Sequence, residues 1–128
     1  MSMTLSLKPM GKPRQSQSDK WRLRPVVCRY RSYADALRAS FHLLPLAKFL
    51  QVGRVTVIAT FMTKCSDRYG KPHRQKPDAD NIMKGVKDSL IRKDETVYWE
   101  LTEKRWGEQD SLKIILEEVV YAETDLSG

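Results

Sequence analysis

Alternation of apolar and polar residues along the chain predicts four β-strands. The pattern is clearest in residues 53–62, where every second side chain is apolar and points to one side: Val55, Val57, Ala59 and Phe61. This period of two is typical of a strand. Shorter alternating stretches predict strands at residues 3–9, 96–106 and 112–121. The turn "EQD" at residues 108–110 predicts that the last two strands form a hairpin.

Apolar residues three and four positions apart predict two helices. The first covers residues 32–44, with Ser32 as its N-terminal cap. The second runs from Asn81 to about Arg92, and its apolar side is formed by Ile82, Met83, Val86 and Leu90. The mixture of elements predicts an α+β fold, a single domain over residues 1–128 with a small mixed β-sheet and two main helices.

Positive charge is concentrated in two segments. The chain has 23 Lys and Arg against 16 Asp and Glu, a net charge of +7. The excess gathers in residues 8–31, which read as a basic arm, and in the loop at residues 64–76. Clustered positive charge favours contacts with the phosphates of nucleic acid. The residues expected to bind DNA are Lys12, Arg14, Lys20, Arg22, Lys71, Arg74 and Lys76.

Other features of the sequence limit the class of protein. No apolar run approaches the ~20 residues of a membrane-spanning helix, and the N-terminus has no apolar stretch of signal-peptide length. Cys28 and Cys65 lie far apart and fit no metal spacing, which indicates reduced thiols in a cytoplasmic protein. His73 is expected to be solvated in its basic loop, and residues 122–128 to form a loose tail.

The motif "KPDADNIMKGVKDSL" at residues 76–90 places two carboxylates close together in a basic chain. Asp78 and Asp80 are two residues apart, so on an extended chain their side chains leave the same face. Such neighbours repel each other unless a cation lies between them. Mg²⁺ is commonly held by a few carboxylates together with substrate phosphate. The alternative for Asp80 is a purely structural role as helix cap.

Lys84 lies four residues after Asp80 and four before Asp88, so the three share one helix face. They could form only surface salt bridges, worth about 0.3–0.5 kcal/mol each. Alternatively, the lysine neutralises charge on a phosphate or a leaving oxygen. An acidic metal site, a nearby lysine and basic surroundings together indicate a nuclease.

The motif, followed by "KDETV" at residues 93–97, resembles the signature of the RusA-type Holliday junction resolvases. These are small, dimeric, Mg²⁺-dependent endonucleases that are often carried by phages. The matching positions are Asp78, Asp80, Asn81, Ile82 and Lys84, then Asp88 and Leu90 in the helix, then the step from Asp94 to Val97.

The resemblance implies roles for individual residues. Asp78, Asp80 and Asp94 would be the catalytic carboxylates that bind Mg²⁺, and Lys84 would be the catalytic lysine. The family usually has two adjacent acids before the Asp-x-x-Val step and a longer, often Gly-containing turn. This chain departs from that pattern, because Lys93 precedes Asp94 and Glu95 follows it. Alignment on Val97 selects Asp94, which we prefer, whereas alignment on the end of the acidic pair selects Glu95.

Geometry raises a question about the third carboxylate. The predicted helix is about 18 Å long at ~1.5 Å per residue, and Asp94 lies past its far end. A two-fold homodimer could place Asp94 of one subunit near Asp78 and Asp80 of the other, which is our hypothesis. Alternatively, the strand that runs back would deliver Glu100 or Glu103.

The expected function is therefore a Mg²⁺-dependent, structure-selective endodeoxyribonuclease. Its substrate would be the four-way DNA junction, and it would act in recombination and repair in a bacterial or phage-infected cell. Two alternatives stay open. One is a non-catalytic basic module that binds nucleic acid, and the other is a metal nuclease that acts on flaps or RNA.

Overall fold

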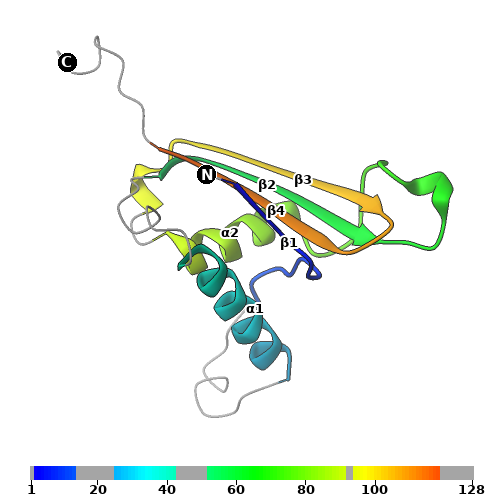
Figure 1. Cartoon of the computed structure of the whole chain (residues 1–128), viewed down its shortest axis with the longest axis horizontal. Coiled ribbons are helices and arrows are strands. Elements are labelled where there is room, and N and C mark those ends of the chain that lie inside the picture. The colour runs from blue at the N-terminus through cyan, green and yellow to red at the C-terminus, as the bar shows by residue number, and fades with distance from the viewer. Residues whose placement is uncertain (1, 14–24, 43–51, 92–93, 119–128) are drawn as a thin grey trace, which may run out of the picture.

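The computed structural model describes residues 2–13, 25–42, 52–91 and 94–118, and it has the α+β architecture that the sequence predicts. Two helices lie on one side of a four-stranded mixed sheet (Figure 1). The elements in chain order are β1 (Ser2–Leu5), α1 (Pro25–His42), β2 (Val52–Met62), the 3₁₀ turn η3 (Ser66–Arg68), α2 (Ala79–Leu90), the 3₁₀ turn η4 (Asp94–Thr96), β3 (Trp99–Gly107) and β4 (Ser111–Glu118).

The strand order in the sheet is β1-β4-β2-β3. β2 pairs with β4 in antiparallel and with β3 in parallel orientation. The prediction of a β3–β4 hairpin is therefore wrong, because β2 lies between the two strands. The connection between them is fastened to the end of β2, where the Met62 amide donates to Asp110 Oδ1 at 2.8 Å. The central place suits β2, since both of its faces are at least partly apolar.

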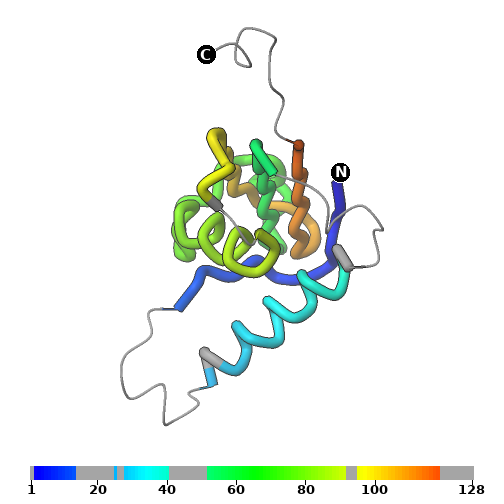
Figure 2. The backbone as a smooth tube through the Cα atoms, turned by 90° about the vertical axis from the view of Figure 1, so that its left-hand side faces the viewer, coloured from blue at the N-terminus to red at the C-terminus, as the bar shows by residue number. Residues whose placement is uncertain are grey.

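The core lies between the sheet and the two helices. The alternate residues of β2 that the pattern assigned to one side, Val55, Val57, Ala59 and Phe61, are all buried. On β4 the predicted alternation also holds, with Leu112, Ile114 and Leu116 buried. Leu37 of α1 with Ile82 and Val86 of α2 close the core from the helical side, and Figure 2 shows both helices on that side. The opposite face of the sheet is covered by no helix in the described ranges.

Helix α1 begins at Pro25, so the predicted start at Ser32 is wrong. Proline fits the first turn of a helix, because its missing N–H would have no partner there. Residues 25–31, which we predicted as part of the basic arm, are therefore helical. The buried residues Tyr30, Tyr33 and Leu37 follow the three- to four-residue spacing of a core-facing stripe. Exposed arginines lie among these buried residues in the first turns, so the sequence pattern did not indicate a helix there.

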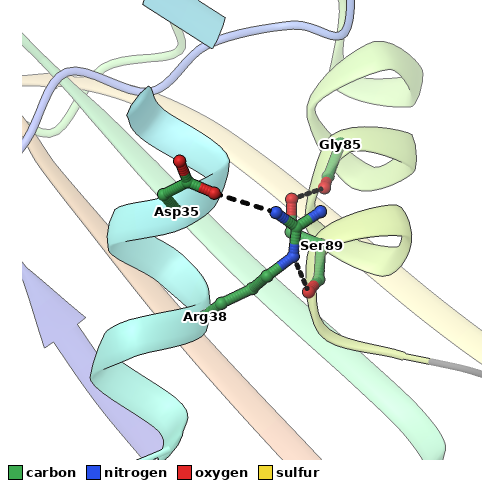
Figure 3. A network of polar contacts seen from close by, with 4 residues as sticks. All are labelled: Asp35, Arg38, Gly85 and Ser89. Atoms are coloured by element: carbon green, nitrogen blue, oxygen red, sulfur yellow. Dashed lines mark hydrogen bonds and ion pairs between the residues drawn. The ribbon is translucent and has the colours of Figure 1, made fainter. Parts of the chain in front are cut away.

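A polar network joins α1 to α2 (Figure 3). The Arg38 guanidinium donates from Nε to the carbonyl of Ser89 at 3.1 Å and from a terminal nitrogen to Asp35 at 3.1 Å. The buried Ser89 hydroxyl donates to the carbonyl of Gly85 at 2.7 Å. These bonds satisfy the polar groups at the end of α2 and fix that helix against α1.

Neither α1 nor α2 has the length and apolar character that a membrane-spanning segment requires, within the part of the chain that the structure describes. Cys28 and Cys65 are both exposed, and neither forms a disulfide.

Candidate active site

The two aspartates of the motif lie at the N-terminus of α2. Asp78 is the N-cap residue, with φ −67° and ψ 147°, and Asp80 lies in the first helical turn. The prediction that both leave one face of an extended chain is therefore wrong, because the helix begins at Ala79 rather than Asn81. Capping by Asp80 is also excluded, since Asp78 occupies the cap position. Both carboxylates are exposed at the positive end of the helix dipole.

The carboxylate of Asp78 is not used to cap the helix. Its backbone carbonyl accepts the first helical hydrogen bond from Ile82 at 3.1 Å, but its side chain makes no capping bond. An N-cap aspartate normally accepts a bond from the N–H groups of the first turn. The exposed Asp78 carboxylate therefore makes no capping bond that a ligand would have to replace.

Lys84 is placed beside Asp80, as the spacing predicted. Lys84 Nζ lies 3.4 Å from Asp80 Oδ2, and the two side chains are 57% and 78% exposed. Such an exposed pair adds little to stability. Asp88, which we expected to share this face with Lys84, instead forms an ion pair with Lys12. Lys84 therefore forms its ion pair with Asp80 and not with Asp88, and its side chain is exposed to solvent.

The third carboxylate is not supplied by β3 of the same chain. Glu100 forms an ion pair with Lys87 at 2.5 Å. Glu103 is bound to Arg105 at 2.7 Å, and its register opposite Ile58 puts it on the sheet face away from α2. The alternative in which Glu100 or Glu103 completes the site is therefore wrong.

Asp94 lies at the far end of α2. It begins η4, which follows the C-terminus of that helix (Figure 1), and α2 spans 12 residues, about 18 Å at ~1.5 Å per residue. No group of three His, Cys, Asp or Glu side chains forms a metal site among the residues described, which do not include the Asp94 side chain. Within the described part of one chain, α2 thus begins with two exposed carboxylates, Asp78 and Asp80, and places Lys84 beside Asp80.

The two aspartates fit part of a Mg²⁺ site. They offer oxygen ligands, are exposed, and have no capping bond to give up. Mg²⁺ keeps several water ligands and needs only one or two carboxylates when substrate phosphate completes its shell.

A basic loop between β2 and α2 extends past the end of the sheet (Figure 1). Lys71, Arg74 and Lys76, which we expected to bind DNA, are exposed on it. Lys12 is exposed as well, and its ion pair with Asp88 places it over α2. The other expected DNA-binding residues lie outside the described ranges: Arg14, Lys20 and Arg22. The described cations therefore lie on the segments that flank the N-terminus of α2.

The expectation that His73 is solvated is wrong. Its side chain is buried and stacks on Phe61, with 3.9 Å between the ring centroids. The Trp106 ring is tilted against the same imidazole, with 4.4 Å between the ring centroids. Its backbone amide donates to the carbonyl of Lys104 at 3.1 Å. Burial, and to a smaller extent the charge of Lys104, lower the pKa of His73. His73 thus anchors the base of the loop as a neutral aromatic ring.

The lowered pKa of His73 predicts a loss of stability in acid. Because the folded state disfavours the charged ring, stability is complete above the ordinary histidine pKa and is lost as pH falls through the lower folded value. We expect the H73F variant, which keeps an aromatic ring, to lose less thermal stability than the wild type between pH 8 and pH 5. Thermal denaturation at both pH values measures this effect, and the fall in Tm should be smaller for H73F than for the wild type.

The other histidine provides the control for this experiment. His42 ends α1, and the H42Q variant should keep the acid sensitivity of the wild type. An H73F protein whose Tm falls as steeply as that of the wild type would show that His73 is not the titrating group.

A family model described as endodeoxyribonuclease RusA matches residues 6–117. No curated protein is similar enough to the chain to count as a match. The matched region includes both helices, the basic loop and the carboxylates at the start of α2.

Proposed function

Because the chain belongs to the RusA endodeoxyribonuclease family, we propose that it is a Mg²⁺-dependent nuclease that resolves Holliday junctions in DNA recombination and repair. The observation that supports this most is the N-terminus of α2. There, Asp78 and Asp80 are exposed, the Asp78 carboxylate makes no capping bond, and Lys84 lies beside Asp80. The basic loop leads directly into this group.

Each part of the chain has a distinct task in this proposal. Asp78 and Asp80 hold Mg²⁺ near the scissile phosphate. When bound, Mg²⁺ supplies an activated water and offsets the charge that develops on the phosphodiester. Lys84 neutralises charge on the phosphate or the leaving oxygen from the exposed side of α2. Lys71, Arg74 and Lys76 hold the DNA backbone, so binding weakens steeply with salt.

The third carboxylate comes from a second copy of the chain. Asp94 lies past the far end of α2, and neither Glu100 nor Glu103 replaces it. Two α2 helices in antiparallel arrangement across a two-fold axis bring Asp94 of each subunit to the aspartate pair of the other. A four-way junction has paired strands to cut, which suits a two-fold enzyme. Glu95 is the alternative ligand in the same turn.

A comparison of substrates tests this function. The purified chain is incubated with a synthetic four-way junction, a flap, a duplex and a structured RNA, with Mg²⁺ or with EDTA. We expect symmetric cuts in the junction only when Mg²⁺ is present, and little cleavage of the duplex. Preferential cleavage of the flap or of the RNA would show that this nucleic acid, and not the four-way junction, is the substrate. Binding of all these substrates without cleavage would favour the non-catalytic module.

A further inference from the structure

Lys104 holds the backbone that leads into Asp78. Its Nζ donates to the carbonyl of Gln75 at 2.6 Å and to the carbonyl of Pro77 at 2.9 Å. The register of β3 places Lys104 opposite Ala59, on the face of the sheet that the helices cover. Its own carbonyl accepts the amide of His73 at 3.1 Å. One residue of β3 therefore holds the segment from His73 to Pro77 by both its backbone and its side chain.

The bond to Pro77 acts directly on the position of Asp78. The Pro77 carbonyl belongs to the peptide plane that contains the Asp78 amide, so fixing that oxygen fixes the start of Asp78. Hydrogen bonds from an ammonium group are stronger than those between neutral groups. The Asp78 side chain makes no capping bond, so it does not itself fix the position of this residue.

A second contact confines this turn from another direction. The N-terminal segment packs against it at Gly11, where an added Cβ would come within 2.9 Å of Pro77 Cβ and 3.2 Å of Asn81 Cβ. The next residue, Lys12, donates its amide to the carbonyl of Asn81 at 3.3 Å. The turn before Asp78 is thus held by the N-terminal segment and by Lys104 of β3.

We propose that Lys104 is a positioning residue for the nuclease reaction: it aligns Asp78 with the DNA-binding loop through the backbone of residues 75–77. The proposal rests on the function proposed above. Because the same lysine joins the base of the basic loop to the first carboxylate, a phosphate held by the loop meets Asp78 at a fixed distance. In this role Lys104 acts through its bonds to the two backbone carbonyls and needs no contact with DNA.

The K104M variant tests this role, because methionine keeps the length of the side chain and removes the donor. We expect the single-turnover cleavage rate at saturating junction to fall roughly 10- to 100-fold, the usual effect of a small misplacement of reacting groups. Junction affinity should stay within about threefold, since the phosphate contacts remain. The Mg²⁺ concentration for half-maximal rate should rise. K104Q, whose neutral amide NH₂ can still donate hydrogen bonds, should lie between K104M and the wild type.

Lys87 offers a matched control. It also joins α2 to β3, through Glu100 at 2.5 Å. Lys87 comes nine residues after the N-cap Asp78, which is about 13 Å along α2 at ~1.5 Å per residue. K87M should lower the Tm by a similar amount or more, yet keep the wild-type cleavage rate and Mg²⁺ dependence. This separates positioning from a general loss of stability.

Two results would overturn the proposal. One is wild-type cleavage by K104M. The other is a parallel loss of binding, cleavage and Tm in K104M and K104Q, which would make Lys104 a stabilising residue only. If the wild-type chain itself cut none of the DNA substrates, the proposed function would fail instead, so the two failures are distinguishable.

Discussion

Replacing Asp80 by asparagine should abolish junction cleavage and leave junction binding unchanged or tighter. The D80N side chain has the same shape but has lost the charge that holds a divalent cation. Loss of several kcal/mol of transition-state stabilisation corresponds to roughly a 10²- to 10⁴-fold lower rate. Binding is expected to persist, because the basic loop is untouched and one negative charge near the DNA is removed. Single-turnover cleavage and electrophoretic mobility shift on the same junction measure the two effects.

A matched control exists on α1. Asp35 is also an exposed aspartate in a helical ion pair, 3.1 Å from Arg38, and its side chain is 74% exposed. D35N should therefore change stability as little as D80N does and leave cleavage at the wild-type rate. Wild-type cleavage by D80N would show that Asp80 and Lys84 form only a surface salt bridge. The proposed site would then have no support.

The regular elements with a clear apolar period were predictable from the sequence. Strands β2 and β4 and helix α2 each present a stripe that packs on the single core, so local pattern and final burial agree. The start of α1 was not predictable in this way, because arginines and a proline in its first turns resemble a loop. The position of β2 between β3 and β4 depends on pairing between distant segments, which no local pattern reports.

The site was predictable in part. The spacing of Asp80 and Lys84 predicted their contact, which the structure shows. That Asp78 belongs to the same group stays a prediction of the motif. The burial of His73 depends on Phe61 and Trp106, which are distant in sequence, and therefore had no local signal. Lys104 was overlooked for a similar reason. No local signal pointed to it, because the apolar alternation in β3 runs through Trp99 and Leu101, whereas the register with β2 puts Lys104 on the covered face.

The second large effect concerns sharing of the site between subunits. D80N and D94N should each be inactive as homodimers. In a D80N/D94N heterodimer, one site combines both substitutions, whereas the other has intact Asp78 and Asp80 with an intact Asp94 of the partner subunit. We therefore expect one of the two sites in each heterodimer to be active, so that the heterodimer nicks one strand of the junction. Two different affinity tags allow the heterodimer to be isolated.

A different pair of variants provides the control. In a D78N/D80N heterodimer the aspartate pair of each subunit is damaged, so neither site is intact and no cleavage is expected. An E95Q variant tested alongside D94N decides which acid of the turn completes the site.

Nicking by the isolated D80N/D94N heterodimer is the most direct test of the account, because it requires both the carboxylates at the start of α2 and an Asp94 from the partner subunit. The account predicts strand nicking by this heterodimer and none by the D78N/D80N heterodimer. Inactivity of both heterodimers beside an active wild type, or cleavage by a wild-type chain that stays monomeric, would contradict it.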